Sequence, residues 1–254
     1  MQPYSKINTL DREDEEFFFE KSIAHLRTHK SVQSCLADWK GKAVFIKRYP
    51  KPQGLLKFFK HILRGSNARC AIRGAELLIA NGIAAPEPIA LVEKTQYLKA
   101  KRTAAVFEAI KGGSQLAEFF YANKNFRSAL IKRLAQEVAR MHSLNIVHGD
   151  MSPHNIILTD TVRGLRFIWT DNRRTRRVYF LGNKLIVKNF SQLLAHCDWI
   201  SERSKLRFLL SYAKFRGISK AQVVTIISLL NHRLRGRHAL EAMPQCCRQI
   251  YDCQ

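Results

Sequence analysis

Residues 145–160 have the sequence NIVHGDMSPHNIILTD, in which a loop lies between two hydrophobic segments. Asp150 lies in a loop that contains a glycine and a proline, and Asn155 follows it five positions later at the start of an apolar run. A second apolar run, LRFIWTD at 165–171, ends on Asp171. Loops between hydrophobic segments tend to carry chemistry, because a rigid scaffold presents them to ligands. We therefore expect a functional site around Asp150.

The two apolar runs predict a pair of short strands. Paired as a hairpin, they would bring Asn155 and Asp171 close to Asp150. Two carboxylates and a carboxamide suit Mg²⁺, a hard cation that keeps waters and substrate phosphates among its ligands. Asp150 would accept a proton from a hydroxyl, while Asn155 and Asp171 would hold the metal. The alternative is a turn aspartate and a turn-capping asparagine without catalytic roles.

The rest of the chain divides at 111–114, where KGGS separates a strand-rich part from a helix-rich part. The first part predicts a hairpin, a capped helix and two further strands, over 31–49, 67–82, 84–93 and 97–110. The second part predicts helices, among them 116–124, 127–145, 204–215 and 220–234. We expect a two-lobed α+β fold, with an acidic N-terminal extension (1–24), a small β-rich N-lobe (25–110) and a larger α-helical C-lobe (111–254).

The formal net charge of +23 over 254 residues favours an anionic partner: nucleic acid, an anionic membrane surface or a phosphorylated substrate. Six cysteines without a Cys-x-x-Cys pair give no metal-ligand spacing. The acidic start is unlike a signal peptide, and no apolar run approaches the roughly 18 residues that span a bilayer. We expect a cytoplasmic protein that is peripheral to the inner face of the cell membrane.

His148-Gly149-Asp150, followed by Asn155 and Asp171, resembles the catalytic core of the protein-kinase-like fold. This variant of the motif, with glycine between histidine and aspartate, is similar to the one in the kinases of small molecules and the atypical kinases. More narrowly, the chain resembles the lipopolysaccharide kinase (Kdo/WaaP) family over roughly residues 34–194. Three segments carry this likeness: NARCAIRGAELLIANGIAAPEPIALVE, VHGDMSPHNIIL and WTDNRRTRR.

The resemblance implies ATP and Mg²⁺ as cofactors and assigns roles to individual residues. Lys47 would contact the α- and β-phosphates of ATP, and Glu76 would pair with Lys47. The backbone of Glu108 to Ile110 would form the hinge that meets adenine. The remaining implied roles are catalytic base for Asp150, Mg²⁺ ligand for Asn155 and Asp171, and structural support of the loop for His148.

The chain departs from the protein-kinase pattern at three places. No Gly-x-Gly-x-x-Gly precedes Lys47, and the segment 27–35 contains no glycine. Phe45 stands where protein kinases usually have alanine, so the adenine pocket is expected to be narrower. Asn172-Arg173 replaces Phe-Gly after the metal aspartate, so the switching of that segment in protein kinases should not be assumed.

Two basic segments are candidates for substrate and membrane contacts. Arginine suits paired contacts with phosphate or carboxylate, so the run after Asp171 predicts acceptor binding; the alternative is a solvated basic loop. The members of this run are Arg173, Arg174, Arg176 and Arg177. The segment 55–64, with Lys57, Lys60 and Arg64 among apolar residues, predicts a basic amphipathic helix on anionic lipid or a helix packed on the small lobe.

The resulting hypothesis is an ATP-dependent kinase that phosphorylates a sugar hydroxyl, on Kdo or heptose, in the lipopolysaccharide inner core. Its expected partners are the lipid A-linked acceptor and the anionic inner-membrane surface. One alternative is an atypical Ser/Thr protein kinase, since fold does not fix substrate. The other is a basic nucleic-acid-binding protein, which only the charge favours. No recognition motif is present, so no specific nucleic acid is expected.

Overall fold

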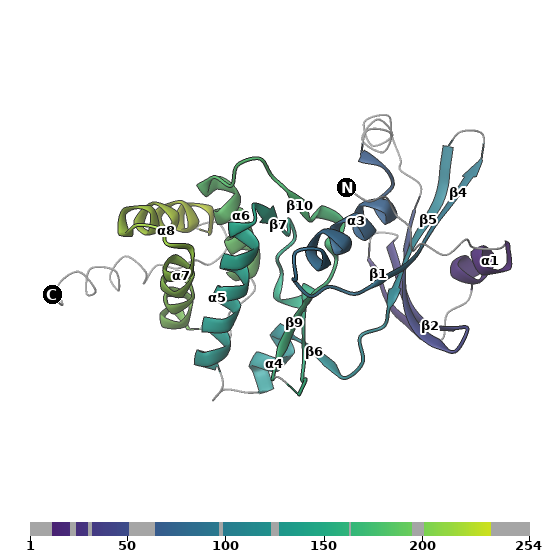
Figure 1. Ribbon diagram of the computed structural model, residues 1–254, viewed down its shortest axis with the longest axis horizontal. Helices are drawn as coiled ribbons and strands as arrows, with labels where there is room; N and C mark the ends of the chain where they lie inside the picture. The colour runs from purple at the N-terminus through teal and green to yellow at the C-terminus, as the bar shows by residue number, and fades with distance from the viewer. Residues whose placement is uncertain are drawn as a thin grey trace. The chain divides into compact units, whose positions relative to one another are not determined.

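The computed structural model describes residues 12–20, 24–29, 32–50, 64–96, 99–122, 127–162, 164–194 and 201–234. They form two compact units (Figure 1). The first unit contains the residues up to Gly112 together with Trp169–Arg174, and the second contains Gly113–Ile168 and the residues from Thr175 onwards. The predicted α+β architecture, with a small antiparallel sheet in one part and helices in the other, is confirmed. Residues 55–63 of the predicted basic helix lie outside the described residues, as do four of the six cysteines, Cys197, Cys246, Cys247 and Cys253.

The first unit is built on a five-stranded antiparallel sheet. Its strand order is β1 (Ala24–His29), β2 (Val32–Trp39), β3 (Lys42–Tyr49), β5 (Lys99–Glu108) and β4 (Pro88–Gln96). The predicted hairpin is β2–β3, in which Trp39 pairs with Lys42 across the turn Lys40-Gly41. Both turn residues have positive φ, 53° and 76°, as a two-residue hairpin turn of type I′ requires. Strand β1 was not predicted from the sequence.

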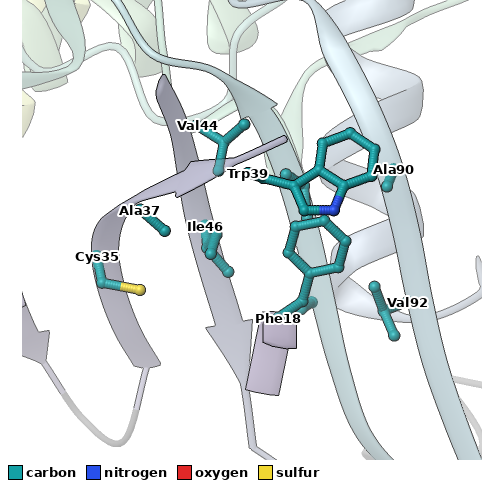
Figure 2. Packing of buried hydrophobic residues seen from close by; sticks show 10 residues of the cluster. Phe18, Cys35, Ala37, Trp39, Val44, Ile46, Ala90 and Val92 are labelled. Carbon is teal, nitrogen blue, oxygen red and sulfur yellow. The ribbon is translucent and has the colours of Figure 1, made fainter. Parts of the chain in front are cut away.

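The two faces of this sheet carry different clusters because side chains alternate along each strand. Val44 and Ile46 of β3 point to one face, where they pack with Phe18 and Trp39 (Figure 2). Phe45 and Tyr49 lie in the cluster that packs against helix α3. Strand alternation therefore assigns Lys47, between Phe45 and Tyr49, to the α3 face.

Helix α1 (Arg12–Glu20) covers the opposite face, although the sequence suggested only an acidic extension. Phe18 is fully buried against the indole of Trp39, and Asp14 accepts hydrogen bonds from Trp39 Nε1 at 2.8 Å and Lys40 Nζ at 2.9 Å. On the sheet side, Arg48 Nε donates to the carbonyl of Phe18 at 2.7 Å. The acidic segment is thus a helix that contributes Phe18 to the hydrophobic core.

Helix α3 (Asn67–Ile79) begins where the sequence predicted, since the Ser66 hydroxyl caps it by accepting from Arg69 N at 2.9 Å. It ends at Ile79, three residues before the predicted end. Gly82, with φ of 68°, completes the turn that follows by donating its N–H to the carbonyl of Ile79. The buried side chains of α3 include Ala68, Ala71, Ile72, Ala75 and Leu78.

Helices dominate the second unit (Figure 1). They are α4 (Leu116–Ala122), α5 (Arg127–Ser143), α6 (Asn183–Leu194), α7 (Glu202–Arg216) and α8 (Lys220–Leu234). Short strands form two small sheets: β6 (Gly113–Gln115) with β8 (Ile156–Thr159) and β9 (Arg166–Trp169), and β7 (Ile146–Val147) with β10 (Arg176–Arg177). The two predicted strands are therefore confirmed as the neighbours β8 and β9. None of the helices in the described ranges is long and apolar enough to cross a membrane.

A buried histidine joins three of these helices. His142 of α5 is fully buried, with Nδ1 at 2.9 Å from Tyr212 Oη of α7 and Nε2 at 2.9 Å from Asn189 Nδ2 of α6. Burial, with a smaller effect of Arg216, lowers the pKa of His142 to about 3. An asparagine N–H directed at Nε2 also requires the neutral ring, because a protonated Nε2 would be a second donor.

This histidine predicts a loss of stability in acid. It is neutral in the folded chain but takes up a proton near pH 6.5 when unfolded, so the unfolded state binds more protons below that pH. Between pH 6.5 and pH 5 the free energy of unfolding should fall by about 2 kcal/mol on this account, at about 1.4 kcal/mol per pH unit. The free energy of unfolding, measured with urea at pH 7 and at pH 5, should therefore change by about 2 kcal/mol less in His142→Phe than in the wild type. An equal dependence in the two proteins would rule out the assignment to His142.

Candidate active site

In the first unit, Lys47 forms an ion pair with Asp171. Its Nζ lies 2.7 Å from Asp171 Oδ1, and both side chains are partly exposed. Lys47 lies in the middle strand of the sheet, flanked by Ser34 of β2 and Ala105 of β5. Asp171 adopts a left-handed backbone, with φ of 55°, which is uncommon for a residue other than glycine. Such a strained residue is typical of functional sites, where the surrounding structure holds it in place.

The predicted pairing of Lys47 with Glu76 is not seen in this structure and stays a prediction. Both residues are described, yet Lys47 pairs with Asp171, and no ion pair joins Lys47 to Glu76. Burial raises the pKa of Glu76, and the positive charge of Arg73 partly offsets that rise. The turn that follows Asp171 packs directly on α3.

That turn is the 3₁₀ segment η2 (Asn172–Arg174), and Gly74 of α3 is what allows its close approach. A Cβ added to Gly74 would lie 2.0 Å from the carbonyl oxygen of Asn172, far inside any real contact. Arg173 Nη1 donates to Asn67 Oδ1 of α3 at 3.3 Å. The buried Asn172 donates from Nδ2 to the carbonyl of Trp169 at 2.8 Å. The segment after Asp171 is thus held on both sides.

Tyr49 forms an apolar wall beside the ion pair. Lys47 Nζ lies 6.0 Å from the centre of its ring, and the hydroxyl is buried without a hydrogen-bond partner among the described residues. Burial raises the pKa of Tyr49, and the charge of Asp171 raises it further. Tyr49 therefore stays protonated at neutral pH, which excludes it as a base.

The predicted hinge, Glu108 to Ile110, follows strand β5. The N–H of Glu108 donates to the carbonyl of Glu87 at 2.9 Å, and that of Ala109 donates to Ala43 at 3.1 Å. These two amides are therefore occupied by the sheet. Within the described ranges no acceptor engages the N–H of Ile110, so of these three amides it is the one left for the predicted adenine contact.

In the second unit, Asp150 lies in a tightly hydrogen-bonded loop. Its carbonyl accepts from Ser152 N at 2.8 Å and from Asn155 Nδ2 at 2.9 Å. Ser152 caps the 3₁₀ segment η1 (Pro153–Asn155), and Met151 and Pro153 are buried beneath it. The Asp150 side chain is partly exposed. A hydrogen bond thus joins the Asn155 side chain to the Asp150 backbone, and the metal role of Asn155 stays a prediction.

Gln192 of α6 braces this loop, a contact that was not predicted from the sequence. Its Nε2 donates to the carbonyl of Gly149 at 3.1 Å, while its Oε1 accepts from Met151 N at 3.3 Å. One side chain thus holds the residues on both sides of Asp150. Next to it, the buried His148 accepts through its carbonyl from Thr175 Oγ1 at 3.2 Å.

Gln192 is expected to position Asp150. Gln192→Leu should lower kcat by about tenfold or more, since small displacements of a catalytic group are costly, with little change in the KM for ATP. Gln192→Glu keeps the acceptor for Met151 and loses the donor to Gly149, so its kcat should lie between those of wild type and Gln192→Leu. Lys184→Ala, an exposed change on the same helix, is the control. Wild-type kcat in Gln192→Leu would contradict the role.

The structure divides the predicted arginine run. Arg173 and Arg174 belong to the first unit, and Arg173 contacts Asn67 of α3 there. Arg176 and Arg177 belong to the second unit, where they form the exposed strand β10 beside β7. Arg173 is engaged in holding η2, whereas Arg176 and Arg177 lie on an exposed strand.

The oxygen ligands predicted for Mg²⁺ fit that ion in chemical type. Because Asn155 uses Nδ2 to reach Asp150, the carbonyl oxygen is the atom through which it would hold a metal. Asp171 supplies a carboxylate. Across the described ranges, no group of three or more His, Cys, Asp and Glu side chains is arranged for a metal. Mg²⁺ is commonly held by one or two carboxylates with waters and phosphates. Asp171 belongs to the first unit, whereas Asp150 and Asn155 belong to the second. That the three side chains meet around one metal therefore stays a prediction.

A solved structure described as WaaP in complex with acyl carrier protein matches with a TM-score of 0.68 and 17% sequence identity, covering 90% of this chain and 94% of that chain. The likeness confirms the predicted protein-kinase-like two-lobed fold. No curated protein gives a significant match. The model of the lipopolysaccharide kinase (Kdo/WaaP) family matches residues 23–212, most of the chain. The chain belongs to the lipopolysaccharide kinase (Kdo/WaaP) family.

Proposed function

We propose that this kinase-family member transfers the γ-phosphoryl group of ATP, in the presence of Mg²⁺, to a hydroxyl of Kdo or heptose in the lipopolysaccharide inner core. The observation that carries the proposal is the ion pair between Lys47 Nζ and Asp171 Oδ1, at 2.7 Å. It joins a cation suited to phosphate oxygens with a carboxylate suited to a metal, on a residue whose backbone is strained. Lys47 is held by strand β3, and Asp171 directly precedes the segment η2 that packs on α3.

The nucleotide would use the first unit. Lys47 would contact the α- and β-phosphates, and the N–H of Ile110 would donate to the adenine ring. Asp171, together with Asn155 of the second unit, would hold Mg²⁺, which when bound neutralises charge on the phosphates. Glu76 stays a proposed nucleotide-site residue; in this structure its pairing with Lys47 gives way to Asp171.

Asp150 would act on the acceptor. It accepts the proton of the attacking hydroxyl, whose oxygen forms a bond to the γ-phosphorus while the bond from that phosphorus to the β–γ bridging oxygen breaks. ADP leaves with the electrons of that bond. The brace from Gln192 and the bond from Asn155 keep the loop of Asp150 in place during the exchange.

Charge supports an anionic acceptor. The inner core carries Kdo carboxylates and lipid A phosphates, and the chain has 43 Lys and Arg against 20 Asp and Glu. Guanidinium groups hold such oxygens by paired, charge-assisted hydrogen bonds. Arg176 and Arg177 lie on the strand paired with β7, which directly precedes the loop of Asp150. We assign these two arginines, with Arg174, to acceptor binding, at the inner face of the cell membrane.

The proposal is tested with the purified chain, γ-labelled ATP and Mg²⁺. Three acceptors are compared: deacylated lipopolysaccharide core oligosaccharide, dephosphorylated casein, and a basic peptide rich in serine. Label should enter the oligosaccharide and be absent with Asp150→Asn. Label in casein or the peptide, with none in the oligosaccharide, would favour an atypical protein kinase and overturn the proposal.

A further inference from the structure

Two neighbouring aromatic side chains in the second unit project into solvent. The exposed fractions of Tyr179 and Phe180 are 103% and 77%, the highest among the exposed aromatic residues described. Single exposed apolar residues are ordinary on protein surfaces. Here two adjacent aromatic residues directly follow the exposed Arg176 and Arg177 of β10, separated by Val178. We call these four residues the Arg–aromatic edge.

The backbone of this edge is anchored, so its exposure is a property of an ordered segment. Arg176 pairs with Val147 and Arg177 with Ile146 in the β10–β7 ladder. The N–H of Val178 then donates to the carbonyl of Asn145 at 2.8 Å. Beyond the aromatic pair the chain turns inward at Leu181, which is buried.

Gly182 adds room for the second ring. A Cβ at Gly182 would lie 3.2 Å from a ring carbon of Phe180, tighter than most real contacts. The ring therefore lies over the backbone of Gly182 while most of its surface faces solvent. An ordered backbone that presents two aromatic side chains outward loses little conformational entropy when a ligand covers them.

The edge lies beside the loop of the proposed catalytic base. The partners of Arg176 and Arg177 are the two residues of β7, and His148, Gly149 and Asp150 follow them directly. Thr175, which precedes the edge, donates to the carbonyl of His148. All these residues belong to the second unit, so this arrangement does not depend on the first.

We propose that the Arg–aromatic edge docks on an anionic lipid surface and so brings a lipid-linked acceptor to Asp150. Tyrosine and phenylalanine insert at the boundary between head groups and acyl chains. There the apolar ring is buried, while the tyrosine hydroxyl remains hydrated. Arginine is attracted to anionic head groups at the same depth. The side chains and the charge of the edge match this surface. The inference rests on the proposed function only in assigning a lipid-linked acceptor; the lipid contact stands on the edge itself.

Sedimentation with vesicles tests the contact directly. The full chain should bind vesicles of equal parts phosphatidylglycerol and phosphatidylcholine at low salt, and bind phosphatidylcholine alone much more weakly. Tyr179→Ser/Phe180→Ser should weaken binding to the anionic vesicles by about tenfold or more, equivalent to about 1.4 kcal/mol. Arg176→Gln and Arg177→Gln should each weaken it roughly fivefold, an effect that shrinks at high salt. Val162→Ser changes an apolar residue that is 106% exposed in the turn between β8 and β9, and should leave binding unchanged.

Activity separates the lipid contact from other roles of the edge. Tyr179→Ser/Phe180→Ser should retain phosphorylation of soluble, deacylated core oligosaccharide and lose it on vesicle-embedded lipopolysaccharide. Equal losses on both acceptors would show that the rings contact sugar, and would overturn the inference. Vesicle binding by the aromatic double variant equal to wild type, or failure of the wild type to bind anionic vesicles, would also overturn it. Vesicle binding as described, with no kinase activity on any core acceptor, would leave the lipid contact standing and refute the proposed function.

Discussion

Asp150→Asn should lower kcat by roughly 10² to 10⁴-fold, the contribution typical of a positioned general base. Asparagine has nearly the same shape but cannot accept the proton of the acceptor hydroxyl. The hydrogen bonds that shape the loop use the Asp150 carbonyl, which accepts from Ser152 and Asn155, so the substitution leaves them intact. Binding of ATP and the melting temperature should therefore stay close to those of the wild type.

The matched control is Asp160→Asn, which removes an exposed carboxylate just beyond strand β8. Steady-state rates on core oligosaccharide, with nucleotide binding followed by fluorescence, separate the chemical step from ATP affinity. A fall in kcat smaller than tenfold for Asp150→Asn would remove Asp150 from the role of base. A fall of equal size for Asp160→Asn would point to a general charge effect.

Gly74→Ala should cost about 10²-fold in kcat, although helix propensity alone predicts a gain. Alanine in the interior of a helix is favoured over glycine by about 1 kcal/mol. At this position the new Cβ would lie 2.0 Å from the Asn172 carbonyl oxygen and 2.9 Å from its carbon. The backbone of η2 must therefore move, and Asp171 directly precedes it. A displacement of about 1 Å at a catalytic group can cost a hundredfold in rate.

The comparison for this prediction is Arg73→Ala, an exposed substitution at the preceding position of α3. Gly74→Ala should lower both the melting temperature and kcat, whereas Arg73→Ala should change stability by no more than about 0.5 kcal/mol. A Gly74→Ala protein that is more stable than wild type and equally active would show that η2 does not depend on this contact.

Local signals in the sequence predicted the elements whose cause is local. Ser66 as a cap, the turn at Lys40-Gly41 and the loop from Asp150 to Asn155 each depend on residues close together in the chain. Their hydrogen bonds and backbone angles follow from side-chain chemistry within a few positions. A capped helix, a hairpin and a loop at Asp150 were therefore predictable from the sequence.

Contacts between distant segments were not predictable in this way. Helix α1 has an acidic sequence, and its place in the core depends on Phe18 meeting Trp39. Gln192 lies 41 positions from Met151, so no local pattern links it to the loop of Asp150. The ion pair between Lys47 and Asp171 joins segments far apart in the chain, and so does the close packing of η2 on Gly74. Nor does the spacing of the arginine run reveal that Arg174 and Arg176 belong to different units.

Mass spectrometry of lipopolysaccharide core from cells that lack the protein tests the central claim most directly. Cells complemented with the wild-type chain should carry one more phosphate on an inner-core Kdo or heptose than cells complemented with Asp150→Asn. Fragmentation of the core places that phosphate on the sugar. Identical core masses in the two strains, with both proteins present at equal levels, would contradict the assignment of this chain as a kinase of the lipopolysaccharide core.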